Sequence, residues 1–498
     1  MRYHIITLGC QMNKSDSERV QTVVEGLGFR WTDDEDQADL LGILACSVRQ
    51  KAIDKVYSKI YAWNKAKDKR NLLTFVSGCI LPADKVKFLK LFDLVFTMDE
   101  LPDVPDMIRH YGVATPFSLL WTGSEQVIDA PAPRSDHSNG FPSLLELLQK
   151  KDTNPGEMNV QSESITPSAR TVMDGFWHIQ PHYTSLFEAF VPIQNGCDKF
   201  CTFCAVPYTR GREVSRPSSE ILLEIQSLIN RDYKSITLLG QNVNSYGLDK
   251  SGKEISFPAL LEEIGKMGKH SGKEFWVYFT SPHPRDMTRE VIDVISKYRC
   301  LARQIHLPLQ SGDNNVLVRM NRKHTVEKYR DIVQYIRKTL PEATLFTDII
   351  VGFTGESDLQ FENTRNALKE FEYNMAYIAI YSPRPGAVSA RWQDDIPHAV
   401  KKERLHTLTA DLEITSRKYT REMVGNTYPV LITGLDRKKK YLVGYTEGRI
   451  NVRIPLGNYQ PVGRFVNVKI QAATDFSVEG AMVTEGKKQN LHEKENRI

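Results

Sequence analysis

Three cysteines lie close together near the middle of the chain, in the segment GCDKFCTFC: Cys197, Cys201 and Cys204. Their CxxxCxxC spacing puts three thiolates in one short loop, and three thiolates can bind three irons of a cubane iron–sulfur cluster. The fourth iron then has no nearby cysteine and stays open for a substrate or a cofactor. A structural zinc site is the alternative, but it needs four ligands, and no fourth Cys or His lies beside these three. The spacing therefore favours a [4Fe–4S] cluster.

A second trio of cysteines, Cys10, Cys46 and Cys79, is spread along the N-terminal part of the chain. Each follows a short apolar run that is typical of a strand: YHIITL, DLLGIL and LLTFV. A helix is expected after the first of them, with Ser15 and Glu18 as a capping box. Alternating strands and helices predict a parallel sheet, and its strands end at one edge, so the three thiols can converge there. Ordinary buried thiols are the alternative interpretation.

The remaining pattern divides the chain after residue 117. Residues 118–185 are rich in Ser, Pro, Asp, Asn and Gly and are interpreted as a linker or insertion, partly disordered. Over 186–424, six strand patterns alternate with helical ones, which predicts a barrel or partial barrel rather than two sheets. Residues 425–490 carry short strands with turns and predict a small all-β barrel, and 491–498 form a polar tail. The fold class expected is α/β.

The composition is that of a globular protein of about three domains, with 41% hydrophobic and 25% charged residues. No apolar run approaches the roughly 18 to 20 residues of a membrane helix, and MRYHIITLGC lacks the features of a signal peptide. We therefore expect a cytoplasmic protein that does not bind membranes. The odd number of cysteines, seven, argues against a disulfide framework, and Cys300 is interpreted as a structural thiol. The net charge of +4 leaves the question of nucleic acid to local patches.

The segment CDKFCTFCAVPYTRGREVSRP resembles the radical S-adenosylmethionine (SAM) superfamily, in which an aromatic residue, here Phe203, precedes the last cysteine. The resemblance implies that the open iron chelates the amino and carboxylate groups of the methionine moiety of SAM. Electron transfer into the sulfonium then yields a 5′-deoxyadenosyl radical, which abstracts a hydrogen atom.

The segments TLGCQMNKSDSERV, ACSVRQKA and SGC resemble the N-terminal domain of the methylthiotransferase family of radical SAM enzymes. The resemblance implies a flavodoxin-like domain at 1–117, a radical SAM partial (βα)6 barrel at 186–424 and an RNA-binding TRAM-like barrel at 425–490. It also implies a second, auxiliary [4Fe–4S] cluster, which carries the sulfur and receives a methyl group; its ligands would be Cys10, Cys46 and Cys79. The family's Asn-Thr before the second cysteine is Leu-Ala here, which changes the surroundings of the cluster and removes no ligand.

Several segments at strand ends are expected to face the first cluster and bind SAM. In LLGQNVNSYG, Gln241 and Asn242 are expected to hydrogen-bond the methionine moiety, with a plain turn as the alternative. Ser281 is expected at the ribose, and Gly352 and Phe353 are expected to bracket the adenine. The full set of predicted SAM contacts is Phe203, Gly240, Gln241, Asn242, Ser281, Gln310, Gly352 and Phe353.

Two basic segments predict contacts to RNA, because guanidinium and ammonium groups pair with phosphates. One is the loop PYTRGREVSRP after the cluster cysteines, and the other is the C-terminal module, where Tyr441 and Tyr445 alternate with basic residues. Solvated loops and turns are the alternative in both places. The predicted contacts are Arg210, Arg212, Arg216, Lys438, Lys439, Lys440, Arg449 and Arg453.

The family resemblance implies tRNA modification, with SAM as both methyl donor and radical source. The segment GCQMN and the basic C-terminal module favour the branch that replaces the hydrogen on carbon 2 of N6-isopentenyladenosine, at position 37 of tRNA, with a methylthio group. The alternatives are threonylcarbamoyladenosine in tRNA, an aspartate of ribosomal protein S12, and a non-catalytic iron–sulfur protein that binds RNA or senses redox state. We expect a monomer whose partners are tRNA, an electron donor and a sulfur donor.

Overall fold

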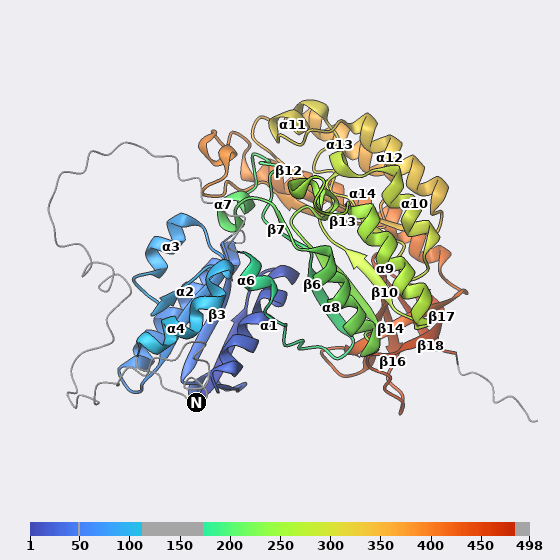
Figure 1. The fold of residues 1–498 in the computed structure, drawn as a ribbon. Helices are drawn as coiled ribbons and strands as arrows, with labels where there is room; N and C mark the ends of the chain where they lie inside the picture. The colour runs from blue at the N-terminus through green and yellow to red at the C-terminus, as the bar shows by residue number, and fades with distance from the viewer. Residues whose placement is uncertain (48–49, 112–172, 484–498) are drawn as a thin grey trace, which may run out of the picture.

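The computed structural model describes residues 1–47, 50–111 and 173–483. Figure 1 shows three parts: an N-terminal α/β unit in blue, a larger central unit in green to orange, and a C-terminal set of strands in red below the central unit. In the described part of the chain, no helix is long and apolar enough to cross a membrane.

The N-terminal unit is a five-stranded parallel sheet in the order β2-β1-β3-β4-β5. Its strands are β1 (Arg2–Thr7), β2 (Arg30–Trp31), β3 (Leu40–Cys46), β4 (Leu73–Cys79) and β5 (Leu94–Val95). The helices of this unit are α1 (Gln11–Gly26), α2 (Gln50–Lys67), α3 (Pro82–Phe88) and α4 (Val104–His110), with the 3-10 turns η1 (Glu35–Gln37) and η2 (Met98–Asp103). Every residue of β3 and β4 is buried, because helices cover both faces of a parallel sheet. The flavodoxin-like order is the predicted one.

Helix α1 begins directly after Cys10, which is its N-cap residue. The predicted capping box is wrong, because Ser15 and Glu18 lie inside the helix and are buried. The Ser15 hydroxyl donates to the carbonyl of Phe190 at 3.1 Å, and Glu18 accepts from the Thr184 hydroxyl at 2.9 Å. These two side chains therefore join the N-terminal unit to the central unit.

The end of the predicted linker belongs to the folded structure. Helix α6 (Met173–Trp177) buries Phe176 and Trp177 in the hydrophobic cluster that also holds Val20 and Phe96 of the N-terminal unit. The linker predicted at 118–185 therefore extends too far, because apolar residues from 173 onward pack against α1 and η2. Residues 118–172 of that prediction lie outside the described residues.

Replacing Trp177 by alanine is expected to lower the free energy of unfolding of the N-terminal unit by about 3–5 kcal/mol. The side chain is 1% exposed, so its removal leaves a cavity between α6 and the N-terminal core. Urea denaturation measures the change, with Trp31→Ala as the control, since Trp31 is 57% exposed in the same unit. Equal destabilisation by both variants would contradict the packing of α6 described above.

The central unit contains two three-stranded parallel sheets, β10-β9-β6 and β11-β12-β13. Its strands are β6 (Glu188–Pro192), β9 (Ser235–Leu239), β10 (Trp276–Phe279), β11 (Gln304–His306), β12 (Thr344–Val351) and β13 (Met375–Ile380), beside the short pair β7 (Gln194–Asn195) and β8 (Val214–Ser215). The Val277 amide donates to the Cys300 carbonyl at 2.7 Å, and the Val277 carbonyl accepts from the Ala302 amide at 2.9 Å. These bonds join the two sheets, so the six strands form the predicted partial barrel.

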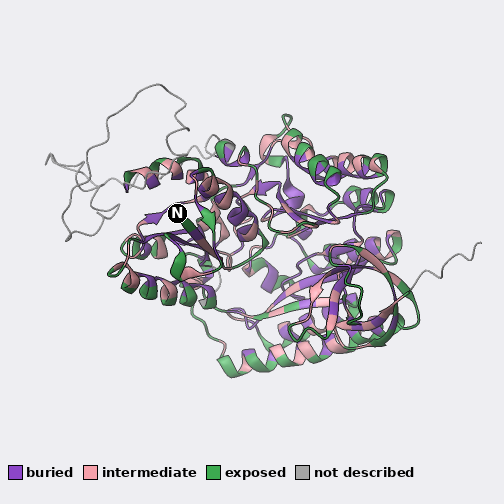
Figure 2. Ribbon diagram, turned by 90° about the horizontal axis from the view of Figure 1, so that it is seen from below, coloured by how far each residue is buried: buried purple, intermediate pink, exposed green. Residues whose placement is uncertain are grey.

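Helices surround this barrel on its outer side. They are α8 (Ser218–Asn230), α9 (Phe257–Ser271), α10 (Arg289–Lys297), α11 (Asn314–Arg319), α12 (Val326–Thr339), α13 (Asp358–Phe371) and α14 (His398–Glu422). The short helix α7 (Val206–Arg210) instead lies beside β4 of the N-terminal unit. The 3-10 turns are η3 (Val243–Ser245), η4 (Leu248–Lys250), η5 (Pro284–Asp286) and η6 (Val388–Arg391). Figure 2 shows the strands largely buried and the outward faces of the helices exposed, as expected for helices that cover a sheet.

The C-terminal unit is a closed five-stranded barrel in the order β14-β15-β16-β18-β17. Its strands are β14 (Thr427–Leu435), β15 (Tyr441–Thr446), β16 (Asn451–Pro455), β17 (Phe465–Ala473) and β18 (Ser477–Met482). It packs on the central unit through aromatic rings, with the Trp276 ring centroid 4.5 Å from that of Phe465 and 6.2 Å from that of Tyr445. This is the small all-β module that the sequence predicts.

Candidate active site

The first three cysteines lie together at the carboxyl edge of the N-terminal sheet. Cys46 and Cys79 end β3 and β4 and are register partners, and Cys10 follows β1, the neighbour of β3. The approach is close at Gly9, where a Cβ atom would lie 2.8 Å from the Cβ of Cys46. In this topology the strand order changes direction between β1 and β3, and ligand sites typically lie at the strand ends beside that point.

Asn13 holds the backbone around these cysteines. Its amide Nδ2 donates to the carbonyls of Leu8 at 2.7 Å and Ala45 at 2.6 Å, and its Oδ1 accepts from the Cys79 thiol at 3.5 Å. Burial raises the pKa of Cys79 to about 12, so a metal bound by this thiol would have to displace its proton. Sequence reasoning missed Asn13, although it lies in the segment that resembles the family.

The other three cysteines occupy the loop between β7 and α7. The Cys197 amide donates to the Gly211 carbonyl at 3.2 Å, and the Cys204 amide donates to the Cys201 carbonyl at 3.0 Å. Gly196 has φ 78°, and a Cβ there would lie 1.9 Å from the Arg212 carbonyl oxygen, so the loop requires glycine at this position. Burial raises the pKa of Cys204 to about 12 and that of Cys197 to about 11.

The donor atoms of the two trios suit iron–sulfur clusters, because cysteine thiolates are the usual protein ligands of the irons in a cubane. Among the described residues, no three His, Cys, Asp or Glu side chains are grouped closely enough to hold one metal ion. In a cubane each thiolate binds a different iron, so the three sulfurs need no common point. Both trios are also free cysteines on rigid strand ends or a tight loop.

Gln241 and Asn242 follow β9, where the sequence places the methionine moiety. The Asn242 amide donates to the Ser245 hydroxyl at 2.7 Å and to Asp286 at 3.2 Å. Its Oδ1, like the Oε1 of Gln241, is buried and accepts no hydrogen bond from any described residue. Buried oxygens without partners are rare, and an ammonium group such as that of SAM would satisfy them. A Cβ at Gly240 would approach Gln194 Oε1 to 3.1 Å, so the chain is tight there.

Three other predicted SAM contacts have positive backbone φ angles. Ser281 has φ 57° and is exposed, and Gln310 has φ 73° with its backbone bonded to Asp348 and Ile350 of β12. Gly352 has φ 68°, and its amide donates to Glu356 at 2.7 Å. These residues all lie at or beyond strand ends of the barrel, on the side of the cysteine loop.

The ring of Phe353 is not placed to bracket the adenine of SAM, which is the role that the sequence predicts for it. The ring is fully buried, with the Tyr381 ring centroid at 4.9 Å and that of Trp392 at 6.0 Å. Phe203 is partly buried against the same cluster. A ring enclosed by other rings has no free face for adenine, so the structure does not support bracketing by this side chain.

Two of the three loop arginines are not available to RNA. Arg216 is buried and forms ion pairs with Glu220 and Glu224 of α8. Arg210 is 5% exposed and pairs with Asp16 of α1. The prediction of phosphate contacts is wrong for both, because their charges are already neutralised inside the protein. Arg212 is exposed, with its side chain over the Phe200 ring at 4.9 Å, and stays a predicted contact.

A cavity of about 700 Å³ lies between the three units. Its walls come from the inner face of the barrel, from the Cys10 loop and from the C-terminal unit. The lining includes Cys10, Thr237, Tyr278, His306, Phe346, Asp348, Met375, Tyr377, Tyr445, Arg449 and Ile450. The His306 Nε2 and Asp348 Oδ2 atoms are 3.0 Å apart and form a polar pair on this wall. The cavity therefore joins Cys10 to the interior of the barrel.

Arg449 belongs to this cavity rather than to an open RNA surface. Its guanidinium lies 3.8 Å from the Tyr278 ring centroid and 4.1 Å from that of Tyr445, and it donates to Ser235 and Thr237 of β9. Its contact to an RNA phosphate therefore stays a prediction, and such a contact would have to be made inside this cavity. The two aromatic rings hold the guanidinium in the barrel wall.

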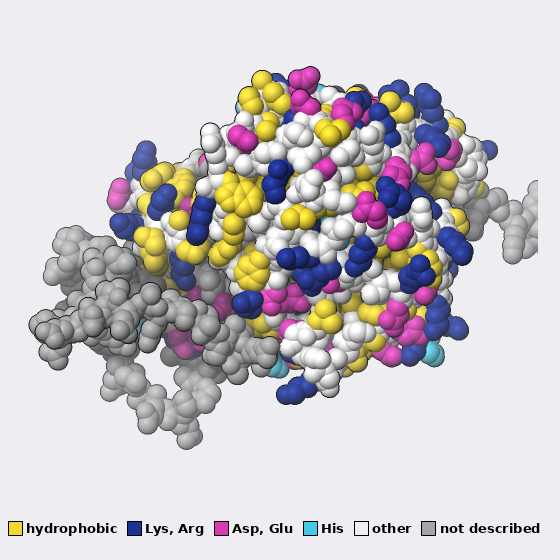
Figure 3. Space-filling view, turned by 90° about the horizontal axis from the view of Figure 1, so that it is seen from above, with side chains coloured by type: hydrophobic (Ala, Val, Ile, Leu, Met, Phe, Trp, Pro, Cys, Tyr) yellow, Lys and Arg dark blue, Asp and Glu magenta, His cyan; other side chains and the backbone are white. Residues whose placement is uncertain are grey.

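The remaining basic residues of the C-terminal unit are accessible. Lys438, Lys439 and Lys440 are exposed in the turn between β14 and β15. Arg453 pairs with Glu479 at 3.1 Å and lies 4.2 Å from the Tyr441 ring centroid. On the face of the molecule in Figure 3, basic side chains are interspersed with acidic ones, so RNA contacts must come from local groups such as this turn.

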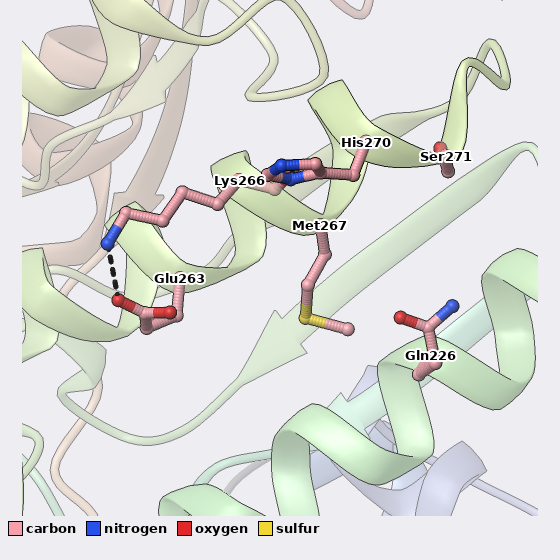
Figure 4. A pocket seen from close by; sticks show the side chains of 6 residues that line it. All are labelled: Gln226, Glu263, Lys266, Met267, His270 and Ser271. Atoms are coloured by element: carbon pink, nitrogen blue, oxygen red, sulfur yellow. Dashed lines mark hydrogen bonds and ion pairs between the residues drawn. The ribbon is translucent and has the colours of Figure 1, made fainter.

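Another pocket lies on the outside of the barrel, between α8 and α9 (Figure 4). Its lining residues are Gln226, Glu263, Lys266, Met267, His270 and Ser271. Glu263 and Lys266 pair with each other at 2.7 Å within one helix. The pocket contains none of the six cluster cysteines and no strand end, so it is not the candidate active site.

Three family models match the chain. The radical SAM superfamily matches residues 191–368, the uncharacterized protein family UPF0004 matches 2–98, and the TRAM domain matches 421–483. Among solved structures, the radical SAM methyltransferase TsrM from Kitasatospora setae has a TM-score of 0.50 at 11% identity, covering 78% of this chain and 73% of that one. That likeness concerns the fold alone.

Curated relatives named tRNA-2-methylthio-N6-dimethylallyladenosine synthase match over nearly the whole chain. The relative from Bacillus licheniformis is 35% identical over 97% of this chain and 86% of its own length. The relative from Carboxydothermus hydrogenoformans is 35% identical over 97% and 99%, and that from Clostridium botulinum is 35% identical over 96% of each. The identity to these relatives, the three matching domains and the two cysteine trios all agree. The chain belongs to the methylthiotransferase family of radical SAM enzymes, which use SAM and [4Fe–4S] clusters.

Proposed function

We propose that this enzyme replaces the hydrogen on carbon 2 of N6-isopentenyladenosine, at position 37 of tRNA, with a methylthio group. The observation that carries the proposal is the cavity that joins Cys10 to the barrel interior. A sulfur carried near Cys10 and a radical formed at the other cysteine loop must reach the same carbon atom. A cavity bounded by both units is suited to that requirement, because it holds the reacting base in one place.

We propose that the cofactors are held by the residues that the site brings together. Cys197, Cys201 and Cys204 would bind one cluster, and Cys10, Cys46 and Cys79 would bind the other. When bound, the clusters and SAM supply the hydrogen-abstracting radical, the sulfur and the methyl group. The amide oxygens of Gln241 and Asn242 would accept hydrogen bonds from the SAM ammonium group and so orient it.

The cavity walls suit a modified adenosine. Tyr377, which is 54% exposed, offers an aromatic face for stacking a base, as single-stranded RNA recognition commonly uses. Met375 and Ile450 offer apolar contact for the isopentenyl chain. The His306–Asp348 pair supplies hydrogen-bonding groups for the edge of the base.

The test is mass spectrometry of tRNA nucleosides from cells in which this gene is deleted. The 2-methylthio derivative of N6-isopentenyladenosine should disappear, and the unmodified N6-isopentenyladenosine should accumulate. Plasmid-borne wild type should restore the product. Normal amounts of the methylthio nucleoside in the deletion strain would overturn the proposal and favour threonylcarbamoyladenosine or the ribosomal-protein substrate. The electron donor, the sulfur donor, the monomeric state and the cytoplasmic location stay predictions.

Replacing Lys438, Lys439 and Lys440 by glutamine is expected to weaken tRNA binding and its dependence on salt. Each lost phosphate contact should reduce the slope of log affinity against log salt by roughly 0.7–0.9, so three contacts should reduce it by roughly 2–3. Cleavage of SAM without RNA should stay unchanged, because the turn lies in the C-terminal barrel, outside the two cysteine sites. Titration of tRNA affinity against salt measures the slope.

A matched control removes the same charge elsewhere. Lys266, Lys269 and Lys273 are exposed at and just beyond the C-terminal end of α9. Their triple glutamine variant should keep the wild-type slope. The same slope in both triple variants would show that the turn after β14 does not contact phosphates.

A further inference from the structure

Arg210 extends from one cysteine site to the other. It ends α7, the short helix that follows Cys204, and its side chain is 5% exposed. The guanidinium Nε donates to Cys79 Sγ at 2.9 Å, and Nη2 donates to Asn13 Oδ1 at 3.1 Å and pairs with Asp16. A residue of the central unit therefore contacts a cluster cysteine of the N-terminal unit.

A purely structural role would not require the contact to sulfur. The Asp16 pair and the bond from Arg210 Nη1 to Asn195 Oδ1 at 3.1 Å would already fix the guanidinium between the two units. Nε nevertheless faces Cys79, so a permanently charged donor lies against a thiolate that would bind iron. Hydrogen bonds to cluster sulfurs and nearby charge set the reduction potential of iron–sulfur clusters.

We propose that Arg210 is a positioning residue that raises the reduction potential of the auxiliary cluster and fixes that cluster against the radical SAM site. The inference rests on the proposed function, in that it takes Cys79 as an auxiliary-cluster ligand. Because Arg210 lies six positions after Cys204 in the chain, a change in the radical SAM loop would reach the sulfur of Cys79 through one short helix.

The sign of the effect follows from charge. Reduction adds one electron, and so one negative charge, to the cluster; the positive charge of Arg210 stabilises the reduced form, and the negative charge of Asp16 opposes it. Arg210→Gln should therefore shift the midpoint potential of the auxiliary cluster to more negative values. Asp16→Asn should shift it to more positive values, because Arg210 then loses its counter-charge. If Arg210 and Asp16 only stabilised the fold, the two substitutions would not shift the midpoint potential in opposite directions.

The experiment uses the full chain with Cys197, Cys201 and Cys204 replaced by alanine, so that only the auxiliary cluster remains. Iron content is measured first, and the midpoint potential is then measured by redox titration with dithionite as the electron source and EPR as the readout. Arg210→Gln and Asp16→Asn should shift the potential in opposite directions, and Arg210→Lys should give a smaller negative shift than Arg210→Gln. Arg30→Gln is the control, because Arg30 is exposed at the other end of the strands.

The outcomes separate this inference from the proposed function. No iron in the parent variant would mean that the N-terminal cysteines hold no cluster, which overturns the proposed function and the inference together. Iron present with an unchanged potential in Arg210→Gln, or shifts of the same sign in both variants, would overturn the role of Arg210 alone. If Arg210→Gln loses the cluster, the Asp16→Asn shift decides, and a shift that is absent or negative overturns the inference.

Discussion

Replacing Cys10, Cys46 and Cys79 together by alanine is expected to halve the iron content and to abolish methylthio insertion while SAM cleavage continues. Two cubanes contain about eight irons, so about four should remain. The reason for the division is spatial: the N-terminal trio lies on a separate sheet, whereas Gln241 and Asn242 lie on the barrel. Anaerobic reconstitution followed by iron analysis, 5′-deoxyadenosine quantification and nucleoside mass spectrometry measures all three quantities.

The reciprocal variant, with Cys197, Cys201 and Cys204 replaced, should also keep about four irons but form neither 5′-deoxyadenosine nor product. Circular dichroism controls for folding in both variants. Full iron content in the N-terminal triple variant would refute the auxiliary cluster. Equal loss of SAM cleavage in both folded variants would refute the division of labour.

Asn242→Ala is expected to weaken SAM binding by roughly 10- to 100-fold at unchanged iron content. A hydrogen bond to a charged group contributes about 1.5–3 kcal/mol, and each 1.4 kcal/mol corresponds to a factor of ten. The unpartnered Oδ1 of Asn242 is the acceptor that the variant removes. Equilibrium binding of SAM to the anaerobic, oxidised enzyme measures the loss.

Ser245→Ala is the matched control for that variant. It removes the hydroxyl that accepts from Asn242 Nδ2 at 2.7 Å but leaves Oδ1 in place. Its affinity for SAM should stay within a few-fold of wild type. An equal loss in both variants would show that Asn242 supports the turn rather than the ligand.

The convergence of the first three cysteines could be predicted because it depends on strand ends alone. Apolar runs identify β1, β3 and β4, and parallel strands share an edge, which is enough to predict that the three thiols can converge. The register that pairs Cys46 with Cys79 is known only from the structure. The partial barrel follows from the same repetition of strand and helix. The sequence did not reveal that α6 is part of the N-terminal core, because a five-residue helix has too short a pattern.

The arginines of the loop could not be assigned from sequence because their partners are distant in the chain. Asp16 precedes Arg210 by 194 positions, and only the packing of α1 against the loop brings the two together. Arg449 likewise meets Tyr278 only after the C-terminal barrel docks. Basic residues in a turn-rich segment usually face solvent, so their local sequence predicts contact with RNA. The prediction fails where the tertiary structure buries the charge against a distant partner.

The contacts of Arg449 with Tyr278 and Tyr445 limit which C-terminal barrels can be exchanged between members of this family. The end of β15 and the turn after it contact the first residues of two strands of the central barrel: Thr344 donates to the Gly448 carbonyl at 2.8 Å, and Tyr445 donates to Glu188 at 2.6 Å. A C-terminal barrel grafted from a relative would place a different turn against strand ends of the central barrel that are complementary to the present turn. Chimaeras should therefore work as matched pairs of barrel and C-terminal unit, and substitutions at Arg449 and Tyr278 should be inherited together.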